Sequence, residues 1–107
     1  MPNQQNKYQL LKSLEQDANL TQRQLSKELG ISLGKVNYCL QSLIQKGFVK
    51  INNFKNSKNK IRYSYLLTPA GIEEKTKLIT EFLKVKTKEY EALKKEVERI
   101  KNADTDK

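Results

Sequence analysis

Two helix-start signals eleven residues apart constrain the fold of this chain more than any other feature. Thr21 with Gln24 three residues later forms the pattern of a capping box, and Ser32 has the residue type of a second helix N-cap. Between them Gly30 supplies the left-handed stop that helix ends favour, and only Ile31 remains as a linker. Two helices joined by so short a turn cross steeply and leave one face of the second helix free, which is the helix-turn-helix arrangement.

The flanking residues complete a small helical unit. Leu10, Leu11 and Leu14 recur at helical spacing and predict a short first helix. The third helix is expected over residues 32–46, before Gly47 ends it. Its buried face should carry Val36, Cys39, Leu40 and Leu43.

Residues 48–54 and 61–67 form a candidate hairpin, because the second segment alternates apolar and polar side chains as a half-buried strand does. The turn between them is polar and basic. We therefore expect a mainly α fold of the α+β class, a winged helix-turn-helix over residues 6–68 with a two-stranded wing. The residues expected on the inner face of the second strand are Ile61, Tyr63, Tyr65 and Leu67.

A long helix should follow the hairpin. Thr68 is a good N-cap, Pro69 is favoured at the first helical position, and only Gly71 interrupts the helical composition before residue 102. A helix over 69–102 outruns the small domain, and its apolar residues repeat every seven positions, which indicates a coiled-coil homodimer. Parallel and antiparallel pairing both remain open, and residues 103–107 are expected to form a disordered tail. The predicted dimerisation residues are Ile79, Phe82, Leu83, Tyr90, Leu93, Val97 and Ile100.

Charge is concentrated in the middle of the chain. The net charge is +9, and residues 21–68 carry nine basic side chains against Glu28 alone, a net of +8. Residues 69–107 carry only +1. A basic block of this kind on a helix-turn-helix indicates a polyanionic partner, and double-stranded DNA is the natural one.

Composition also removes several classes of function. The chain has no histidine and one cysteine, so we expect no metal site and no cofactor. It shows no paired-carboxylate or phosphate-cradling pattern, which argues against an enzyme. The absence of a signal peptide or an apolar stretch of membrane length predicts a cytoplasmic protein without a membrane partner.

The free face of the third helix is the expected DNA-reading surface. Asn and Gln pair with adenine, Lys reaches guanine acceptors, and both groups are found on this face. The start of the preceding helix should contact phosphate, and the basic wing over residues 55–62 should lie on the backbone or in the minor groove. The candidate DNA-binding residues are Ser32, Gly34, Lys35, Asn37, Tyr38 and Gln41 on the third helix, Gln22 and Arg23 on the second, and Lys55, Asn56, Lys58, Lys60 and Arg62 on the wing.

Cys39 has two interpretations. Its place beside the buried stripe fits a small core residue, whereas oxidation within a recognition helix would make it a redox switch. The sequence supplies no second cysteine to form a disulfide with it, so the core role is preferred.

The sequence resembles a known family in several segments. The order of elements and the run LTPAG at 67–71 resemble the MarR group of winged-helix transcriptional regulators. The runs LGISLGKVNYCL at 29–40, VKINNFK at 49–55 and EYEAL at 89–93 are similar to the exopolysaccharide (EPS)-associated MarR-family regulators of bacteria. The resemblance covers about residues 8–100 and implies a bacterial repressor or activator with DNA contacts on the third helix and the wing.

Typical members of that family are longer, dimerise through helices at both ends and often hold a small effector. Here little chain precedes the first helix, so dimerisation should depend on the carboxyl-terminal helix and a pocket for a phenolic-type effector is not expected. The leading hypothesis is a homodimeric transcriptional regulator that binds a pseudopalindromic operator. The alternative is a winged-helix adaptor that binds proteins without specific DNA binding.

Overall fold

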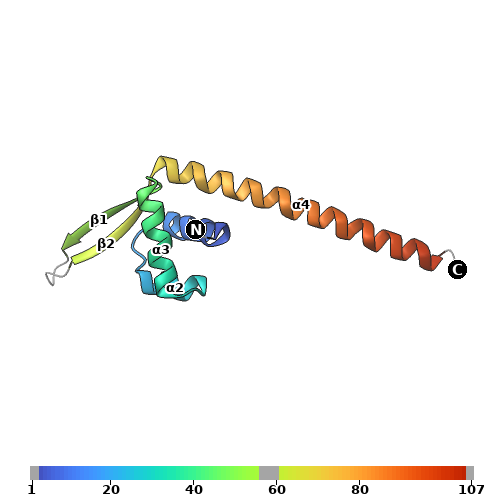
Figure 1. The fold of residues 1–107 in the computed structure, drawn as a ribbon, viewed down its shortest axis with the longest axis horizontal. Coiled ribbons are helices and arrows are strands. Elements are labelled where there is room, and N and C mark those ends of the chain that lie inside the picture. The colour runs from blue at the N-terminus through green and yellow to red at the C-terminus, as the bar shows by residue number, and fades with distance from the viewer. Residues whose placement is uncertain (1–2, 56–60, 106–107) are drawn as a thin grey trace.

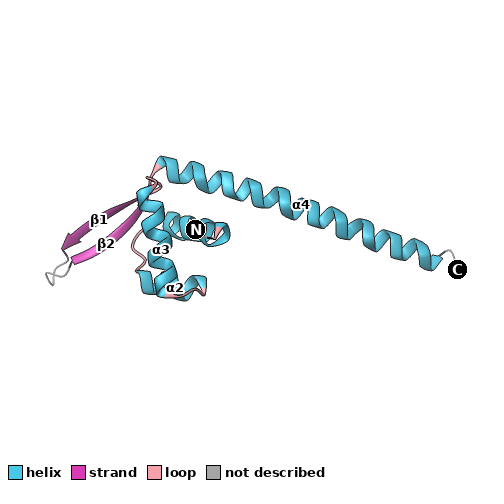
Figure 2. Ribbon diagram, in the orientation of Figure 1, coloured by secondary structure: helices cyan, strands magenta, loops and turns pink. Residues whose placement is uncertain are grey.

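A computed structural model describes residues 3–55 and 61–105 of the chain. The elements follow one another along the chain as α1 (Gln4–Gln16), α2 (Gln22–Leu29), α3 (Leu33–Gln45), β1 (Val49–Lys55), β2 (Ile61–Leu67) and α4 (Pro69–Thr105) (Figures 1 and 2). The strands pair antiparallel, with Val49 opposite Leu67 and Lys55 opposite Ile61. The mainly α fold with a two-stranded wing and a long carboxyl-terminal helix is confirmed.

Local capping sets the helix boundaries. The backbone N–H of Gln24 donates to Thr21 Oγ1 over 3.1 Å, and the N–H of Thr21 donates to Gln24 Oε1 over 2.8 Å, which completes the capping box of α2. Gly30 ends α2 with a φ of 70°, a left-handed conformation that glycine adopts without strain. The helix α1 begins at Gln4, before the expected start near residue 6, because the Asn3 side chain caps it.

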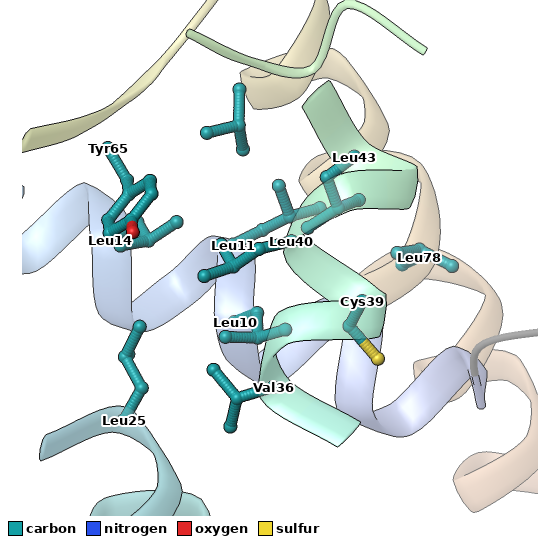
Figure 3. Packing of buried hydrophobic residues seen from close by; sticks show 11 residues of the cluster. Leu10, Leu11, Leu14, Leu25, Val36, Cys39, Leu40, Leu43, Tyr65 and Leu78 are labelled. Atoms are coloured by element: carbon teal, nitrogen blue, oxygen red, sulfur yellow. The ribbon is translucent and has the colours of Figure 1, made fainter. Parts of the chain in front are cut away.

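The core lies where α1, α2 and α3 meet beside the base of the hairpin (Figure 3). Leucines of α1 pack against the inner face of α3, and one residue of each remaining element closes the cluster. The predicted stripe of α3 is buried as expected. The core residues are Leu10, Leu11, Leu14, Leu25, Val36, Cys39, Leu40, Leu43, Val49, Tyr65 and Leu78.

The hairpin is fixed at its base and projects from the domain (Figure 1). The N–H of Tyr65 donates to the carbonyl of Ala18 over 3.0 Å, and Ser64 Oγ donates to Asn19 Oδ1 over 2.8 Å. Tyr65 is buried, but Tyr63, expected on the same inner face, is 52% exposed. Alternation predicts the face of the strand on which a side chain lies, but it does not predict whether the helices cover that face. At Tyr63 the hairpin extends beyond the edge of the helices, so the side chain is exposed.

A hydrogen-bonded corner attaches α4 to the domain. Thr68 Oγ1 accepts from the N–H of Gly71 over 3.0 Å, so Thr68 caps α4 as predicted. The N–H of Thr68 donates to the carbonyl of Phe48 over 3.1 Å. A Cβ atom on Gly71 would lie 2.1 Å from that Phe48 oxygen, so this position requires glycine.

Ion pairs and an aromatic contact fix the first turns of α4 on α1. Lys7 Nζ lies 3.2 Å from Glu74 Oε1, with both side chains largely buried, and 5.2 Å from the centre of the Phe48 ring. Farther along α4, the ring of Phe82 meets that of Tyr8 edge-on, with centroids 5.6 Å apart. The domain therefore covers α4 only as far as Phe82.

Beyond that contact α4 runs free of the domain. Each residue from Leu83 to Asp104 is exposed, and the molecule measures 76 × 26 × 24 Å. The helix continues to Thr105, so the expected boundary at Asn102 and the disordered state expected for residues 103–105 are corrected. Ala103 is a strong helix former, and neither glycine nor proline follows it. Residues 106–107 lie outside the described residues.

Candidate nucleic-acid interface

The outer face of α3 presents the polar side chains that the sequence analysis assigned to DNA. Ser32 Oγ accepts from the N–H of Lys35 over 3.2 Å and so fixes the start of the helix. With the apolar stripe buried on α1, the opposite face is turned to solvent. The exposed residues on it include Ser32, Gly34, Lys35, Asn37, Tyr38 and Gln41, all of them predicted.

A hydrogen-bonded chain links this face to α2 and to the wing. Asn37 Nδ2 donates to Gln22 Oε1 over 3.2 Å, and Gln22 Nε2 donates to the Tyr65 hydroxyl over 3.2 Å. Gln22 is therefore a bridge between α3 and β2 as well as a predicted contact at the start of α2. Arg23, its neighbour in the sequence, is exposed.

Tyr65 is a member of this site that the sequence analysis did not assign to DNA binding. The alternation of β2 placed it correctly on the inner face, but no local pattern shows that its hydroxyl reaches α2. Its position depends on the bonds that dock residues 64 and 65 on the turn after α1. Only the tertiary structure brings these segments together.

A hollow of about 470 Å³ lies between the start of α2 and β2. Its rim combines hydrogen-bonding groups with the cation of Arg62, and the first backbone amides of α2 have no partner within the helix. Such a surface suits a phosphate backbone passing between helix and wing. The lining residues are Asn19, Thr21, Gln22, Gln24, Arg62, Tyr63 and Tyr65.

The wing brings Arg62 next to this hollow. Arg62 is exposed and pairs across the hairpin with Phe54. Lys55 belongs to β1, but its side chain, like all of Asn56, Lys58 and Lys60, lies outside the described residues. The wing contacts predicted for those four positions remain predictions.

Cys39 is enclosed behind the exposed outer face of α3. Its side chain is 3% exposed and lies in the core cluster with Leu40 and Val36. Burial raises the pKa of the Cys39 thiol, an effect that the positive charge of Lys35 partly opposes. A buried thiol held in its neutral form fits the structural role better than the redox role.

The predicted dimerisation residues of α4 fall into two groups. Phe82 is half-buried against Tyr8 of its own domain. The other six are exposed, from 45% at Ile79 to 66% at Leu93. These six are Ile79, Leu83, Tyr90, Leu93, Val97 and Ile100.

Two further kinds of feature are absent from the described parts of the chain. Among residues 3–55 and 61–105, no helix has the length and hydropathy needed to cross a membrane. The same residues contain no group of three or more cysteine and acidic side chains placed to hold a metal ion.

Comparison with known proteins agrees with this geometry. Residues 4–50 match the family model described as winged helix-turn-helix DNA-binding. No curated protein matches the chain at a significant level.

Several solved structures share the fold. The PcaV transcriptional regulator of Streptomyces coelicolor aligns with a TM-score of 0.60 at 18% identity, over 73% of this chain and 54% of its own. Staphylococcus aureus MepR, solved with DNA, aligns with a TM-score of 0.59 at 24% identity, over 79% of this chain and 58% of its own.

A MarR/EmrR family transcriptional regulator from Acinetobacter sp. ADP1 aligns with a TM-score of 0.57 at 20% identity, over 78% of this chain and 56% of its own. The chain thus spans slightly more than half the length of these three proteins. Residues 4–50 match a winged helix-turn-helix DNA-binding domain, and the chain shares the fold of MarR-family transcriptional regulators.

Proposed function

We propose that the chain is a sequence-specific regulator of transcription that binds double-stranded DNA as a homodimer. The observation that carries this proposal is the exposed polar face of α3, which stands beside a projecting hairpin within the segment of net charge +8. The family match over residues 4–50 supports DNA binding by this unit. The protein acts by binding rather than by catalysis and needs no cofactor.

In this proposal α3 enters the major groove. Lys35 and Asn37 are the side chains best suited to base edges, Lys35 for guanine acceptors and Asn37 for adenine. Asn37 already donates to Gln22, so a bidentate pair with adenine would exchange that bond for one to the base. Gln22 thereby orients Asn37 in the free protein.

The basic wing supplies affinity rather than specificity. Arg62 and the lysines of the turn would contact phosphates or the neighbouring minor groove, as would Arg23 at the start of α2. The alignment with MepR, which was solved with DNA, is consistent with this mode of binding.

A dimer would present two copies of α3 to successive major grooves, roughly 34 Å apart or a multiple of this distance. The operator would then be pseudopalindromic. The sequence segments at 29–40, 49–55 and 89–93 favour the EPS-associated subgroup and a cytoplasmic bacterial protein.

Fluorescence anisotropy with labelled duplexes tests the proposal. The protein should bind a random duplex of about 30 base pairs, more weakly as salt rises from about 50 to 200 mM. A preferred site would next be selected from a random pool. Failure to bind any duplex at about 50 mM salt would overturn the proposal in favour of a protein-binding adaptor.

Three alanine variants distinguish the roles of the basic residues. Arg62→Ala should weaken binding to the preferred and random duplexes equally and lower the salt slope by about one. Lys35→Ala should instead reduce discrimination at one or two base positions, by about 1–3 kcal/mol. Lys88→Ala removes the same charge from exposed α4 and should change neither property. Equal losses for all three variants would contradict the assigned interface.

A further inference from the structure

The part of α4 that leaves the domain carries one apolar seam, which a single lysine interrupts. From Ile79 onward, core positions of a heptad repeat alternate at spacings of four and three residues. Within the described residues the seam is exposed along its whole length, with Leu83 at 65% and Leu93 at 66% exposure. The seam positions are Ile79, Leu83, Lys86, Tyr90, Leu93, Val97 and Ile100.

We propose that this seam pairs with that of a second copy as a parallel, in-register, two-stranded coiled coil. The inference rests on the proposed function, because it assumes the homodimer and specifies how its subunits are oriented. The flanking charges and the direction in which α4 leaves the domain support it independently.

The charges beside the seam favour parallel pairing. Glu89 and Glu96 occupy the heptad position before the seam, and Lys94 and Lys101 occupy the position after it. In a parallel pair Glu89 faces Lys94 of the partner subunit, and Glu96 faces Lys101 of the partner subunit. Antiparallel pairing sets positions of the same kind opposite each other, so glutamate would face glutamate or an uncharged residue along much of the seam.

The contacts that Glu89 and Glu96 make within α4 can be exchanged for contacts with a partner subunit. Arg99 now binds Glu96 from three residues along the same helix, and Lys86 lies 3.5 Å from Glu89 in the same way. Both contacts are exposed, and exposed ion pairs of this kind contribute little to stability. These contacts within one helix therefore do not prevent Glu89 and Glu96 from pairing with lysines of a partner subunit.

Lys86 is the polar exception within the seam. A single polar residue at a core position lowers coiled-coil stability but selects one register. With the two helices in register, both Lys86 side chains extend past the seam to water, as their present exposure of 77% permits. If one helix were shifted by seven residues relative to the other, the ammonium of each Lys86 would lie against Ile79 or Leu93 of the partner subunit.

The shape of the molecule gives the second argument. The hairpin and α4 project from the domain in opposite directions (Figure 1). Antiparallel pairing would carry the two hairpins to opposite ends of a rod, pointing away from each other. Parallel pairing brings both copies of α3 and both hairpins to one end, where a single duplex can contact them.

Disulfide trapping tests the orientation in the full chain. Cys39→Ala removes the native thiol, and Ile100→Cys then places one cysteine in the seam near the end of α4. We expect oxidation to link most of the protein as dimers on a non-reducing gel. Glu98→Cys, on the outer side of the same helical turn, is the control and should link at least tenfold more slowly.

An antiparallel pair gives a different pattern. The two residues numbered 100 would then lie about 36 Å apart along the helices, and Ile100→Cys would not link. A mixture of Leu83→Cys and Leu93→Cys chains would link instead, and this result would overturn the proposal. Sedimentation and circular dichroism of each reduced variant establish whether it is dimeric and folded.

DNA binding separates failure of this inference from failure of the proposed function. A linked Ile100→Cys dimer that binds the preferred duplex as tightly as the reduced protein supports the parallel arrangement. A dimer that binds DNA but forms disulfides only in the mixture of Leu83→Cys and Leu93→Cys chains refutes the parallel orientation. That result would not contradict the proposed function as a DNA-binding regulator. A folded monomer that binds DNA overturns the coiled coil, and a chain that binds no duplex overturns the proposed function itself.

Discussion

The corner at Gly71 offers the sharpest test of how α4 is attached. Replacing Gly71 with alanine would place a Cβ atom 2.1 Å from the carbonyl oxygen of Phe48 and 3.2 Å from Cγ of Leu67. The Phe48 oxygen is backbone and already accepts the N–H of Thr68. The clash cannot be relieved by a side-chain rotation, so the start of α4 must move about 1 Å away from the hairpin.

The expected loss of stability follows from three contributions. Overpacking of a tight contact costs about 1–3 kcal/mol, and weakening the Thr68 hydrogen bond costs about 1 kcal/mol more. The helix propensity of alanine returns up to about 1 kcal/mol. Gly71→Ala should therefore lower the free energy of unfolding by roughly 1–3 kcal/mol, which for a domain of this size lowers Tm by about 4–8 °C per kcal/mol.

Gly34→Ala provides the matched control. Gly34 also lies in the first turn of a helix, but a Cβ atom there meets nothing within 4 Å. This variant should be as stable as the parent or gain up to about 1 kcal/mol. Thermal and urea unfolding followed by circular dichroism, at one fixed protein concentration, gives both values. Equal stability of the two variants would refute the described contact between Gly71 and Phe48.

Two further predictions concern buried polar groups. Glu74→Gln should cost about 1–3 kcal/mol in urea unfolding because it leaves the ammonium of Lys7 without its carboxylate; adding Lys7→Met should recover most of the loss, and no recovery would contradict the pairing. Cys39 should react with iodoacetamide at least tenfold more slowly in native protein than in urea near pH 8, because burial raises the pKa of its thiol and blocks access. Equal rates would instead support an accessible, redox-active cysteine.

The features that the sequence predicted correctly are those that short-range interactions decide. The cap at Thr21, the left-handed Gly30 and the cap at Thr68 each depend on residues within about four positions. The buried stripe of α3 depends only on helical periodicity. These signals sufficed for the order of elements and for the exposed face of α3.

The features that it missed depend on contacts between distant segments. The bond from Gln22 to Tyr65 joins residues 43 positions apart, and it forms only because β2 docks on the turn after α1. Burial of Lys7 likewise follows from the approach of Glu74 on α4. No periodicity marks either residue, because their partners are brought close by the tertiary fold.

The distribution of charge along the chain fits the two proposed roles, DNA binding by residues 21–68 and dimerisation by residues 69–107. Residues 21–68 hold a net charge of +8, so two such blocks at one end of the proposed parallel dimer would repel each other, whereas residues 69–107 carry only +1 with both signs mixed. In the proposed dimer, bound DNA would neutralise the blocks and would therefore stabilise the dimer as well as the complex. Added salt would act on dimerisation and on DNA binding in opposite directions. It would favour dimerisation by screening the repulsion between the blocks, but it would weaken the binding of the blocks to phosphate. If α4 were uniformly basic, DNA binding and dimerisation would no longer be assigned to different parts of the chain. The like charges of the two α4 helices would repel each other along the seam, and α4 itself would bind DNA without regard to sequence.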